Sequence, residues 1–492
     1  MKKQIALFCI SFLSTLFLFA QDFTYFNKKI QIGNTPYPSS VVYPLEDGYM
    51  TISTFEIAGI KALMWAKLGS DGEILETRFI DQDDRILEDI ATGDLLLQHP
   101  NGNYYLSYAK RKTDNEDDVD IALLSFNAEE DALIKKEYGT DKKEIPTFLV
   151  ATPDKGFLLG GIQDPDGNAK YYVVKIDAKG EIIWEKTYGT NVVGNASMVV
   201  RDETYFLFGT TETRKNGRDM LLTSISSIGI TNWTKTYGEK TDDTGLKIGL
   251  LPKTGYMIAG RIEEKGEQKQ YYAIVDEKGE VVAKNTYFVE GIGNLETQLL
   301  PVLDGKGFIG VSSFTNKDGY KQPLIMRIDD EAKVLWSISS LTPTAKADVY
   351  VKDIEVGKNK KGYVLTGYNP DAKLPYGWVA SFDYTGVHCS TFACDSTNVV
   401  TEIKDINVKP TVEVVTNPVN AVYHINYNFP KLEKIAPSFY LYNLAGEQVV
   451  STNLDVTKQT MSMSTSDLPS GMYIYITTYR GIKVASGKLI VK

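Results

Sequence analysis

Histidine and cysteine are scarce in this chain of 492 residues, which contains only three of each. The histidines, His99, His388 and His424, stand in unlike contexts, so an imidazole-based metal centre or catalytic triad has almost nothing to use. The sequence also lacks a Gly-x-Ser-x-Gly elbow, a Gly-x-x-x-x-Gly-Lys loop and a His-Glu-x-x-His motif. These absences argue against serine hydrolase, nucleotide and zinc-protease chemistry.

Long apolar runs are also lacking, except at the N-terminus. Lys2 and Lys3 precede an apolar run over residues 5–19, and Ala20 offers a small residue before Gln21. This pattern predicts a signal peptide over residues 1–20, cleaved between Ala20 and Gln21, and no transmembrane segment in the mature chain. The alternative, a membrane anchor, needs about 20 apolar residues.

Excess positive charge is absent as well. The net charge is −10, and removal of the segment with Lys2 and Lys3 takes it to −12. Such a chain repels polyphosphate backbones and anionic lipid surfaces, so nucleic acid is a poor partner.

The mature chain keeps two cysteines, because Cys9 lies within the predicted signal peptide, too early in its apolar run for a lipoprotein cleavage site. Cys389 and Cys394 are five residues apart, and an exported protein meets oxidising conditions, so we predict a local disulfide between them. A metal or redox pair is the alternative. It lacks Cys-x-x-Cys spacing and has only His388 nearby.

A sequence repeat that predicts short strands and tight turns recurs along most of the chain. The repeat is clearest in residues 154–161 (DKGFLLGG), 171–177 (YYVVKID) and 180–189 (GEIIWEKTYG), and it returns in residues 205–238. Each copy of the repeat is marked by a glycine that precedes the first residues of the second strand. In one copy a threonine stands at this position. The markers are Gly48, Gly102, Gly156, Thr204, Gly255, Gly307 and Gly362. A period of about 52 residues built from short strands predicts a β-propeller of seven four-stranded blades.

The ring of blades must close. Residues 23–33 resemble the outer strand of other copies, whereas the seventh copy loses the pattern at Thr385 and Gly386. We therefore expect the N-terminal strand to complete the last blade, which avoids an open sheet edge. Six or eight blades are the alternatives.

The Trp-x-Lys-Thr-Tyr-Gly phrase resembles bacterial β-propeller repeats found in large extracellular proteins. The resemblance covers residues 23–388 and implies a fold more than a function. It departs from the pattern at Val282 and Ala283 and in the first two copies, so blades 1, 2 and 5 are assigned by spacing. Tryptophans recur at one repeat position, and we expect them to pack blades rather than to stack on sugars. The chain's tryptophans are Trp65, Trp184, Trp233, Trp336 and Trp378.

The last 80 residues change register, with alternation and turn signals typical of a small Ig-like β-sandwich. Their phrases resemble the type A C-terminal sorting domain of type IX secretion cargo. The matching residues are Asn417, Pro418, Gly446, Leu468, Pro469, Gly471, Tyr473 and Lys488. The resemblance implies recognition by the type IX translocon, then release or attachment at the outer-membrane surface. An ordinary binding or spacer domain is the alternative.

These patterns divide the chain into four segments. They are a signal peptide (1–20), a propeller (21–394), a linker (395–412) and a sorting domain (413–492).

Acidic clusters are the remaining candidates for a site. They occupy residues 81–84, 114–118 and 164–168, and their oxygens are suitable calcium ligands. The last cluster falls where a hairpin should turn, and a hairpin needs Asp, Asn and Gly in any case. No other cofactor is expected.

We expect a non-catalytic role in which the propeller binds a glycan or a protein. The alternatives are a structural surface or adhesion component, and an extracellular carbohydrate-active or peptide-cleaving enzyme with its site at the channel mouth, for which Asp94, Glu296 and Asp348 are the candidate carboxylates.

Overall fold

The computed structural model describes residues 25–492 with internal gaps. The longer gaps are residues 87–93, 290–297, 390–396, 399–410 and 429–436, and the others span one to five residues. The described elements, β1 to β38, are all strands. The predicted signal peptide with Ala20 and Gln21, and Cys394 of the predicted disulfide, lie outside the described residues.

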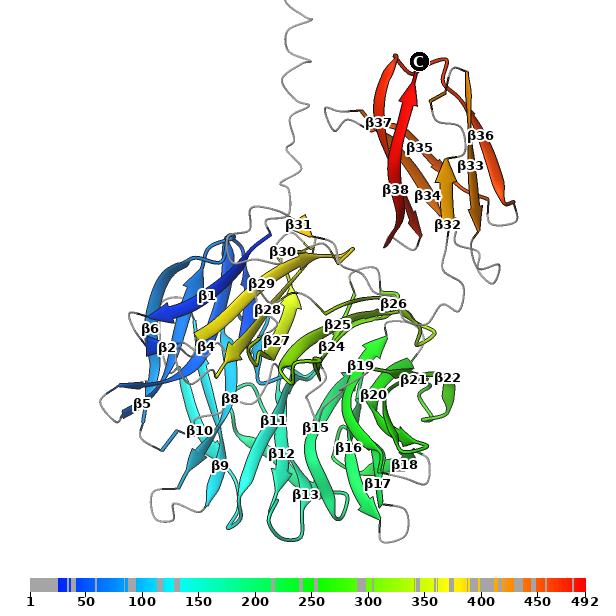
Figure 1. The fold of residues 1–492 in the computed structure, drawn as a ribbon. Coiled ribbons are helices and arrows are strands. Elements are labelled where there is room, and N and C mark those ends of the chain that lie inside the picture. The colour runs from blue at the N-terminus through cyan, green and yellow to red at the C-terminus, as the bar shows by residue number, and fades with distance from the viewer. Residues whose placement is uncertain are drawn as a thin grey trace, which may run out of the picture.

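Six four-stranded antiparallel sheets follow one another along the chain, and in each sheet neighbouring strands are consecutive in sequence. They stand around a ring in Figure 1, coloured from blue to yellow-green. We call them blades 1 to 6, with the first strand of each innermost.

The first three blades use residues 41–188. Blade 1 consists of β3 (Val41–Leu45), β4 (Gly48–Ile57), β5 (Ile60–Leu68) and β6 (Ile74–Gln82). Blade 2 consists of β7 (Leu96–Gln98), β8 (Tyr104–Arg111), β9 (Val119–Phe126) and β10 (Ile134–Tyr138). Blade 3 consists of β11 (Glu144–Ala151), β12 (Phe157–Gln163), β13 (Lys170–Ile176) and β14 (Ile182–Tyr188).

The next three blades use residues 192–338. Blade 4 consists of β15 (Val192–Arg201), β16 (Thr204–Thr213), β17 (Gly217–Ser226) and β18 (Thr231–Tyr237). Blade 5 consists of β19 (Thr244–Leu251), β20 (Gly255–Glu264), β21 (Glu267–Val275) and β22 (Val281–Phe288). Blade 6 consists of β23 (Gln298–Pro301), β24 (Phe308–Thr315), β25 (Lys321–Ile328) and β26 (Val334–Ile338).

Blade 7 closes the ring with a strand from the other end of the chain. Its strands are β27 (Tyr350–Val356), β28 (Gly362–Asn369), β29 (Tyr376–Asp383) and β1 (Asn27–Ile32). Short strands flank it, namely β2 (Thr35–Pro36), β30 (His388–Cys389) and β31 (Thr397–Asn398). β1 pairs antiparallel with β29, with Asn27 opposite Ala380. The predicted closure and the count of seven blades are confirmed.

The predicted turn markers lie in the turn after the first strand of each blade or are the first residue of its second strand. Gly255 and Gly307 have φ angles of 119° and 116°. A Cβ there would lie 2.1 Å from the carbonyl oxygen of Val275 and 2.0 Å from that of Ile328. Glycine is therefore required by both conformation and space.

The repeated Tyr-Gly phrase makes a contact between neighbouring blades. A tyrosine at the end of the outer strand donates a hydrogen bond to a turn carbonyl of the next blade. The pairs are Tyr138 to Gly180 (2.8 Å), Tyr188 to Gly229 (2.9 Å) and Tyr237 to Gly279 (2.8 Å). Trp184 Nε1 similarly donates to the Ser227 carbonyl at 3.0 Å. The recurring tryptophan thus packs blades, as the spacing predicts.

The C-terminal strands form a separate small sandwich. One sheet is β32 (Thr411–Val414), β33 (Val422–Asn428) and β36 (Thr460–Ser464), and the other is β35 (Gln448–Asn453), β34 (Ser438–Tyr442), β37 (Gly471–Tyr479) and β38 (Ile482–Val491). Aromatic and aliphatic residues such as Tyr423, Phe439 and Leu489 fill its core. Of the motif residues, Asn417 and Gly446 lie outside the described residues, and Tyr473 Oη donates to the Pro469 carbonyl at 2.7 Å.

Candidate binding site on the inner strands

The inner strands of blades 3, 4, 5 and 7 share a break in register. It falls between Pro146 and Phe148, Val193 and Ser197, Gly245 and Lys247, and Val351 and Asp353. Such β-bulges re-aim side chains and are over-represented at rims and beside active sites. Polar residues stand in or directly after each break. Together with two further acids they make up the inner-strand polar cluster, defined as Asp94, Thr147, Ser197, Lys247, Asp353 and Glu355.

Strand register places four residues of the cluster at two heights along the ring axis. Ser197, Lys247 and Asp353 each pair with a residue four positions after the turn marker of their blade, namely Phe208, Ala259 and Thr366. Glu355 pairs with Val364, two positions after the marker, and Tyr43 of blade 1 pairs with Met50 at the same height. Equivalent register in a ring of similar blades means equivalent height along its axis.

Three cluster residues hold neighbouring blades together. Amides of the adjacent inner strand donate to them, Ala196 to Thr147 Oγ1 (3.3 Å), Ile248 to Ser197 Oγ (3.4 Å) and Val42 to Asp353 Oδ2 (2.9 Å). An innermost strand has one edge without a strand partner, so its buried amides need such acceptors.

An ion pair joins blades 2 and 5. Lys247 Nζ contacts Asp94 Oδ2, and Ser197 Oγ donates to the same oxygen at 3.4 Å. Asp94 of the predicted carboxylates therefore belongs to the cluster. Asp348 instead accepts a hydrogen bond from the Lys321 amide at 2.8 Å, and Glu296 lies outside the described residues.

Burial and nearby negative charges raise the pKa values of the two acids of blade 7. Burial, with a smaller contribution from the charge of Asp94, raises the pKa of Glu355 to about 7, although the Val356 amide offsets part of the shift. Burial and the charge of Glu355 raise the pKa of Asp353 well above its usual range. Burial, the charge of Glu355 and nearby Tyr104 raise the pKa of Tyr43.

Tyr43 and Tyr104 form an edge-to-face pair with ring centroids 5.4 Å apart. Glu355 is only partly buried, and none of the lysines and arginines in the described residues forms an ion pair with it. The cluster therefore presents one uncompensated carboxyl group near Tyr43, whose ring packs on that of Tyr104.

A second acidic group lies near the start of β9 and β11. Oxygens of Asp118, Asp120 and Glu144 lie within 4.8 Å of one another. The ammonium of Lys112 pairs with Asp118 at 2.9 Å and with Asp120 at 3.4 Å, so a protein cation already lies among these carboxylates. Burial raises the pKa of both Asp120 and Glu144. Of the predicted acidic cluster at 114–118, only Asp118 is described.

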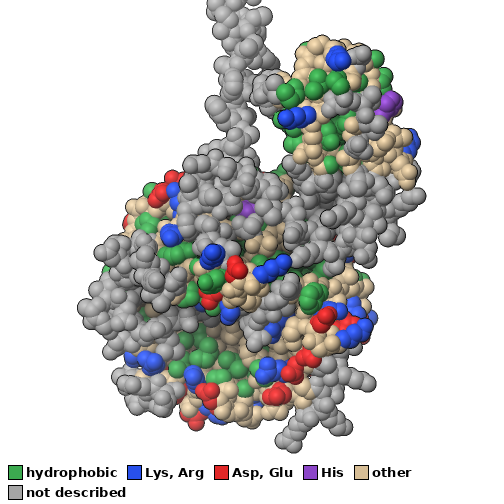
Figure 2. Space-filling view, in the orientation of Figure 1, with side chains coloured by type: hydrophobic (Ala, Val, Ile, Leu, Met, Phe, Trp, Pro, Cys, Tyr) green, Lys and Arg blue, Asp and Glu red, His purple; other side chains and the backbone are tan. Residues whose placement is uncertain are grey.

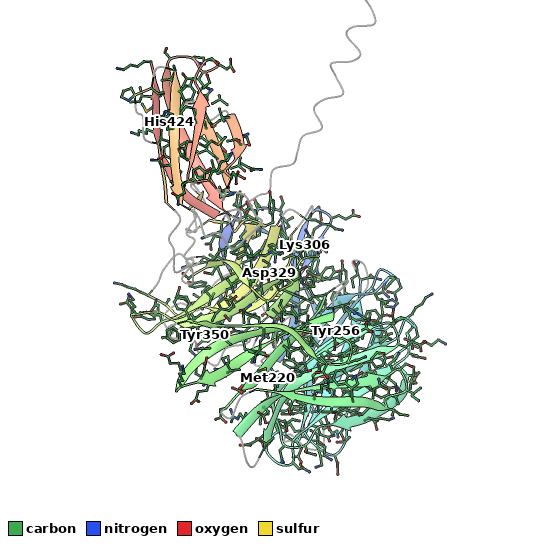
Figure 3. All side chains as sticks on the ribbon, turned by 90° about the vertical axis from the view of Figure 1, so that its right-hand side faces the viewer. Met220, Tyr256, Lys306, Asp329, Tyr350 and His424 are labelled. Carbon is green, nitrogen blue, oxygen red and sulfur yellow. The ribbon has the colours of Figure 1, made fainter. Side chains whose placement is uncertain are left out.

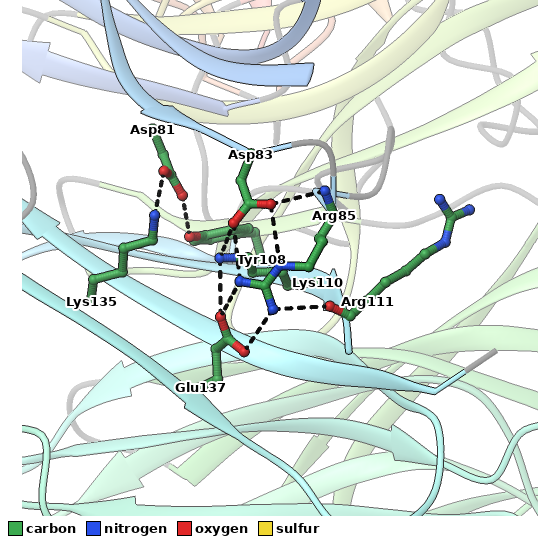
Figure 4. A network of polar contacts seen from close by, with 8 residues as sticks. All are labelled: Asp81, Asp83, Arg85, Tyr108, Lys110, Arg111, Lys135 and Glu137. Carbon is green, nitrogen blue, oxygen red and sulfur yellow. Dashed lines mark hydrogen bonds and ion pairs between the residues drawn. The ribbon is translucent and has the colours of Figure 1, made fainter. Parts of the chain in front are cut away.

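The cluster at 81–84 joins blades 1 and 2 (Figure 4). Asp81 pairs with Lys135 at 2.6 Å, and Asp83 pairs with Lys110 at 2.6 Å and with Arg85 at 3.1 Å. Although burial acts in the opposite direction, hydrogen bonds from Lys110 and Arg85 hold the pKa of Asp83 well below its usual range. Together with Glu137, these residues form a network of three acidic and three basic side chains. Because the charges balance, the network suits a structural role.

The third acidic cluster is a hairpin turn between β12 and β13. The Gly167 amide donates to the Asp164 carbonyl at 3.0 Å, and the Asn168 amide donates to Asp164 Oδ2 at 3.2 Å. These bonds are the ones a turn requires, as the residue types predict.

The sequence did not single out Ser197, Lys247, Asp353 or Glu355. A signal was present, because charged residues interrupt short apolar strands at 247 and at 353–355. It could not be interpreted without knowing which strands adjoin one another around the ring axis.

The fold defines a seven-bladed β-propeller followed by a small β-sandwich. Residues 414–492 match the family described as the secretion system C-terminal sorting domain. The chain thus carries a type IX secretion sorting domain, and its destination is the extracellular space or the outer-membrane surface. The described residues include no helix with the length and apolar character needed to cross a bilayer.

No curated protein matches the chain. Among solved structures, puromycin hydrolase is similar at 11% identity and a TM-score of 0.46, over 82% of this chain and 61% of that one. Sqt1 from Chaetomium thermophilum has 8% identity and a TM-score of 0.42, over 73% and 100%. An endo-arabinanase from Bacillus licheniformis has 12% identity and a TM-score of 0.30, over 62% and 99%. Such distant likenesses say nothing about a shared ligand or activity.

Proposed function

We propose that the propeller of this exported protein is a non-catalytic binding module that takes a glycan at the inner-strand polar cluster. The observation that carries the proposal is the different state of its three carboxyl groups. Asp94 is paired with Lys247, and Asp353 accepts the amides of Val42 and Ile354 at 2.9 and 2.8 Å. Glu355 alone is both partly exposed and without a cationic partner among the described residues.

This arrangement suits sugar recognition. A carboxyl group accepts hydrogen bonds from sugar hydroxyls, and the partly exposed aromatic ring of Tyr43 offers an apolar surface for the C–H groups of a sugar ring. Glycoside hydrolysis usually needs a second carboxyl group to act with the first. Asp353 is the nearest candidate in sequence, but it already accepts the Val42 amide of blade 1 and the Ile354 amide of its own strand.

The test is binding of the purified mature chain to a panel of soluble neutral and acidic polysaccharides, measured by calorimetry. We expect one class to bind and Glu355→Gln to weaken that binding at least tenfold. Glu76→Gln, at an exposed position on β6, is the matched control and should leave it unchanged. Absence of binding to the whole panel would contradict a glycan ligand, and equal binding by Glu355→Gln would contradict the site.

One observation favours an enzyme instead. A carboxyl group with a pKa of about 7 is well suited to proton transfer near neutral pH. An enzyme would release shortened products from the polysaccharide that it binds, and Glu355→Gln would abolish the release. Size analysis of each polysaccharide after prolonged incubation therefore separates the two functions, because a binding module leaves chain length unchanged.

A further inference from the structure

The two sheets of the C-terminal sandwich have unlike outward faces. In the three-stranded sheet, Tyr423, Ile425 and Tyr427 point into the core, so the residues between them point outward. Apart from Val422 at one end, the described outward side chains of this sheet are polar, namely His424, Asn426, Thr460, Ser462 and Ser464. His424 Nδ1 lies 2.7 Å from Ser462 Oγ, and Figure 3 labels this histidine.

The outward face of the four-stranded sheet carries an apolar patch on its central strands. Phe439, Leu441, Tyr473, Tyr475 and Leu489 point inward. Part of the outward positions forms what we call the sorting face, defined as Tyr440, Tyr442, Met472, Ile474, Ile476, Lys488 and Ile490. The outward positions around it are polar, namely Ser438, Ser451, Asn453, Thr478 and Ser486. Met472, Ile474 and Ile490 are 39%, 41% and 40% exposed.

Cross-strand register makes the sorting face continuous. Ile474 lies between Tyr442 and Lys488, and Met472 lies opposite Ile490. Tyr440 pairs with Ile476 in the next row. Figure 2 shows hydrophobic side chains on this domain with basic side chains among them.

An outward apolar patch needs an explanation. Antiparallel sheets with one face on a core usually present polar residues on the other, as the neighbouring sheet does. Contiguous exposed apolar residues mark interaction surfaces.

The charge of the domain indicates the kind of partner. Residues 414–492 contain seven Lys and Arg and four Asp and Glu, a net charge of +3 in a chain whose total is −10. Lys488 stands on the sorting face itself, opposite Ile474. A complementary surface would be apolar at its centre and acidic around it, because charge complementarity speeds encounter and selects partners.

We propose that the sorting face is the surface by which this domain docks onto the type IX secretion machinery, on a protein component with an apolar patch and acidic residues. The proposal rests on the family match of residues 414–492 and is independent of the function proposed for the propeller.

The test is export of the full chain in a host with this secretion route. Ile474→Glu and Lys488→Glu should each lower the secreted fraction at least tenfold, with accumulation in the periplasm. The matched control is Asn426→Glu on the polar face, which should be exported normally. Resistance of the retained chain to limited proteolysis shows that the variant domain is folded.

A milder change guards against misfolding, since Ile474→Thr keeps the β-branched shape favoured in strands. It should remain folded and still reduce export several-fold. Normal export of folded Ile474→Glu or Ile474→Thr would overturn the proposal, and so would an equal loss of export in Asn426→Glu.

Discussion

Blades 2 and 7 make the same contacts with strands of different origin. In blade 2, Lys136 of the outer strand pairs with Glu181 of the next blade at 2.6 Å. In blade 7 the outer strand comes from the N-terminus, and its Lys28 pairs with Glu73 of blade 1, also at 2.6 Å. The contacts of an outer strand are thus determined by its place in the ring rather than by its connection to the chain.

Blade 7 also has polar contacts that tie the two ends of the propeller together. Asn27 Nδ2 donates to the Leu341 carbonyl, and Trp378 Nε1 donates to Asn27 Oδ1, both at 2.7 Å. Tyr25 Oη donates to Asp383 at 2.6 Å. A strand without covalent connection to its blade is held by hydrogen bonds that span more than 300 residues.

Removal of β1 should have the largest effect. A mature chain that begins at Gly33 loses the buried side chains of Phe26 and Ile30 and exposes the edge of β29. We expect a loss of about 5 kcal/mol or more in unfolding free energy, since truncation of one buried Phe already costs about 3–5 kcal/mol. Denaturant unfolding against the chain that begins at Gln21 measures it, and equal stability would show that the ring does not depend on closure.

Loss of the buried side-chain amide of Asn27 in blade 7 should have the second largest effect on the free energy of unfolding. Asn27→Ala leaves the Trp378 Nε1 donor and the Leu341 carbonyl without this partner, which we expect to cost about 2–3 kcal/mol. Asn285→Ala in the outer strand of blade 5 is the control. Its amide makes weaker contacts of 3.3 and 3.4 Å, so its loss should cost under about 1 kcal/mol.

The acids of blade 7 should make stability depend on pH. The pKa of Glu355 is about 7 in the folded chain, against an ordinary value of 4.5. The folded state therefore binds more protons than the unfolded state between these values, and its stability falls as pH rises from about 4.5 to 7. Melting temperature should decrease from pH 5 to pH 8, and by a smaller amount in Glu355→Gln. An identical decrease in both chains would contradict the raised pKa.

A contact between two blades whose strands are consecutive in sequence, such as blades 4 and 5, should contribute less to the free energy of unfolding. Tyr237→Phe removes the hydrogen bond to the Gly279 carbonyl and leaves the ring packing in place. We expect a loss of about 1 kcal/mol by chemical denaturation. A loss as large as that of Asn27→Ala would show that closure is no more demanding than an ordinary blade contact.

The surface ion pairs should contribute least. Lys28→Ala and Lys136→Ala each remove one partly exposed pair, worth about 0.5 kcal/mol at low salt and less at high salt. Similar values for the two variants would confirm that the contacts are equivalent. A much larger effect of Lys28→Ala would show that the closing strand depends on its charge.

Much of the fold was predictable because its signals are local. Turn glycines such as Gly255 and Gly307, the Trp-x-Lys-Thr-Tyr-Gly phrase and the outer-strand character of residues 23–33 are readable within short windows. Blades 1, 2 and 5, assigned by spacing alone, also lie where predicted. The predicted disulfide between Cys389 and Cys394 and the predicted domain limits remain predictions.

The candidate site was mostly not predictable. Asp94 and Lys247 are separated by 153 residues, and no local sequence pattern predicts their ion pair. Asp353 and Glu355 are visible as acids in a short strand, but their raised pKa values come from burial and from nearby charges, Glu355 and Asp94 for Asp353 and Asp94 for Glu355, which depend on the completed ring.

The sequence by itself predicted seven blades, the strand that closes the ring and the sorting domain, because each depends on short-range turns, alternation or motifs. Only the tertiary structure decided which polar residues meet near the ring axis and where the sorting domain presents an apolar patch. These properties depend on the register and placement of strands distant in sequence, and repeat spacing does not encode them.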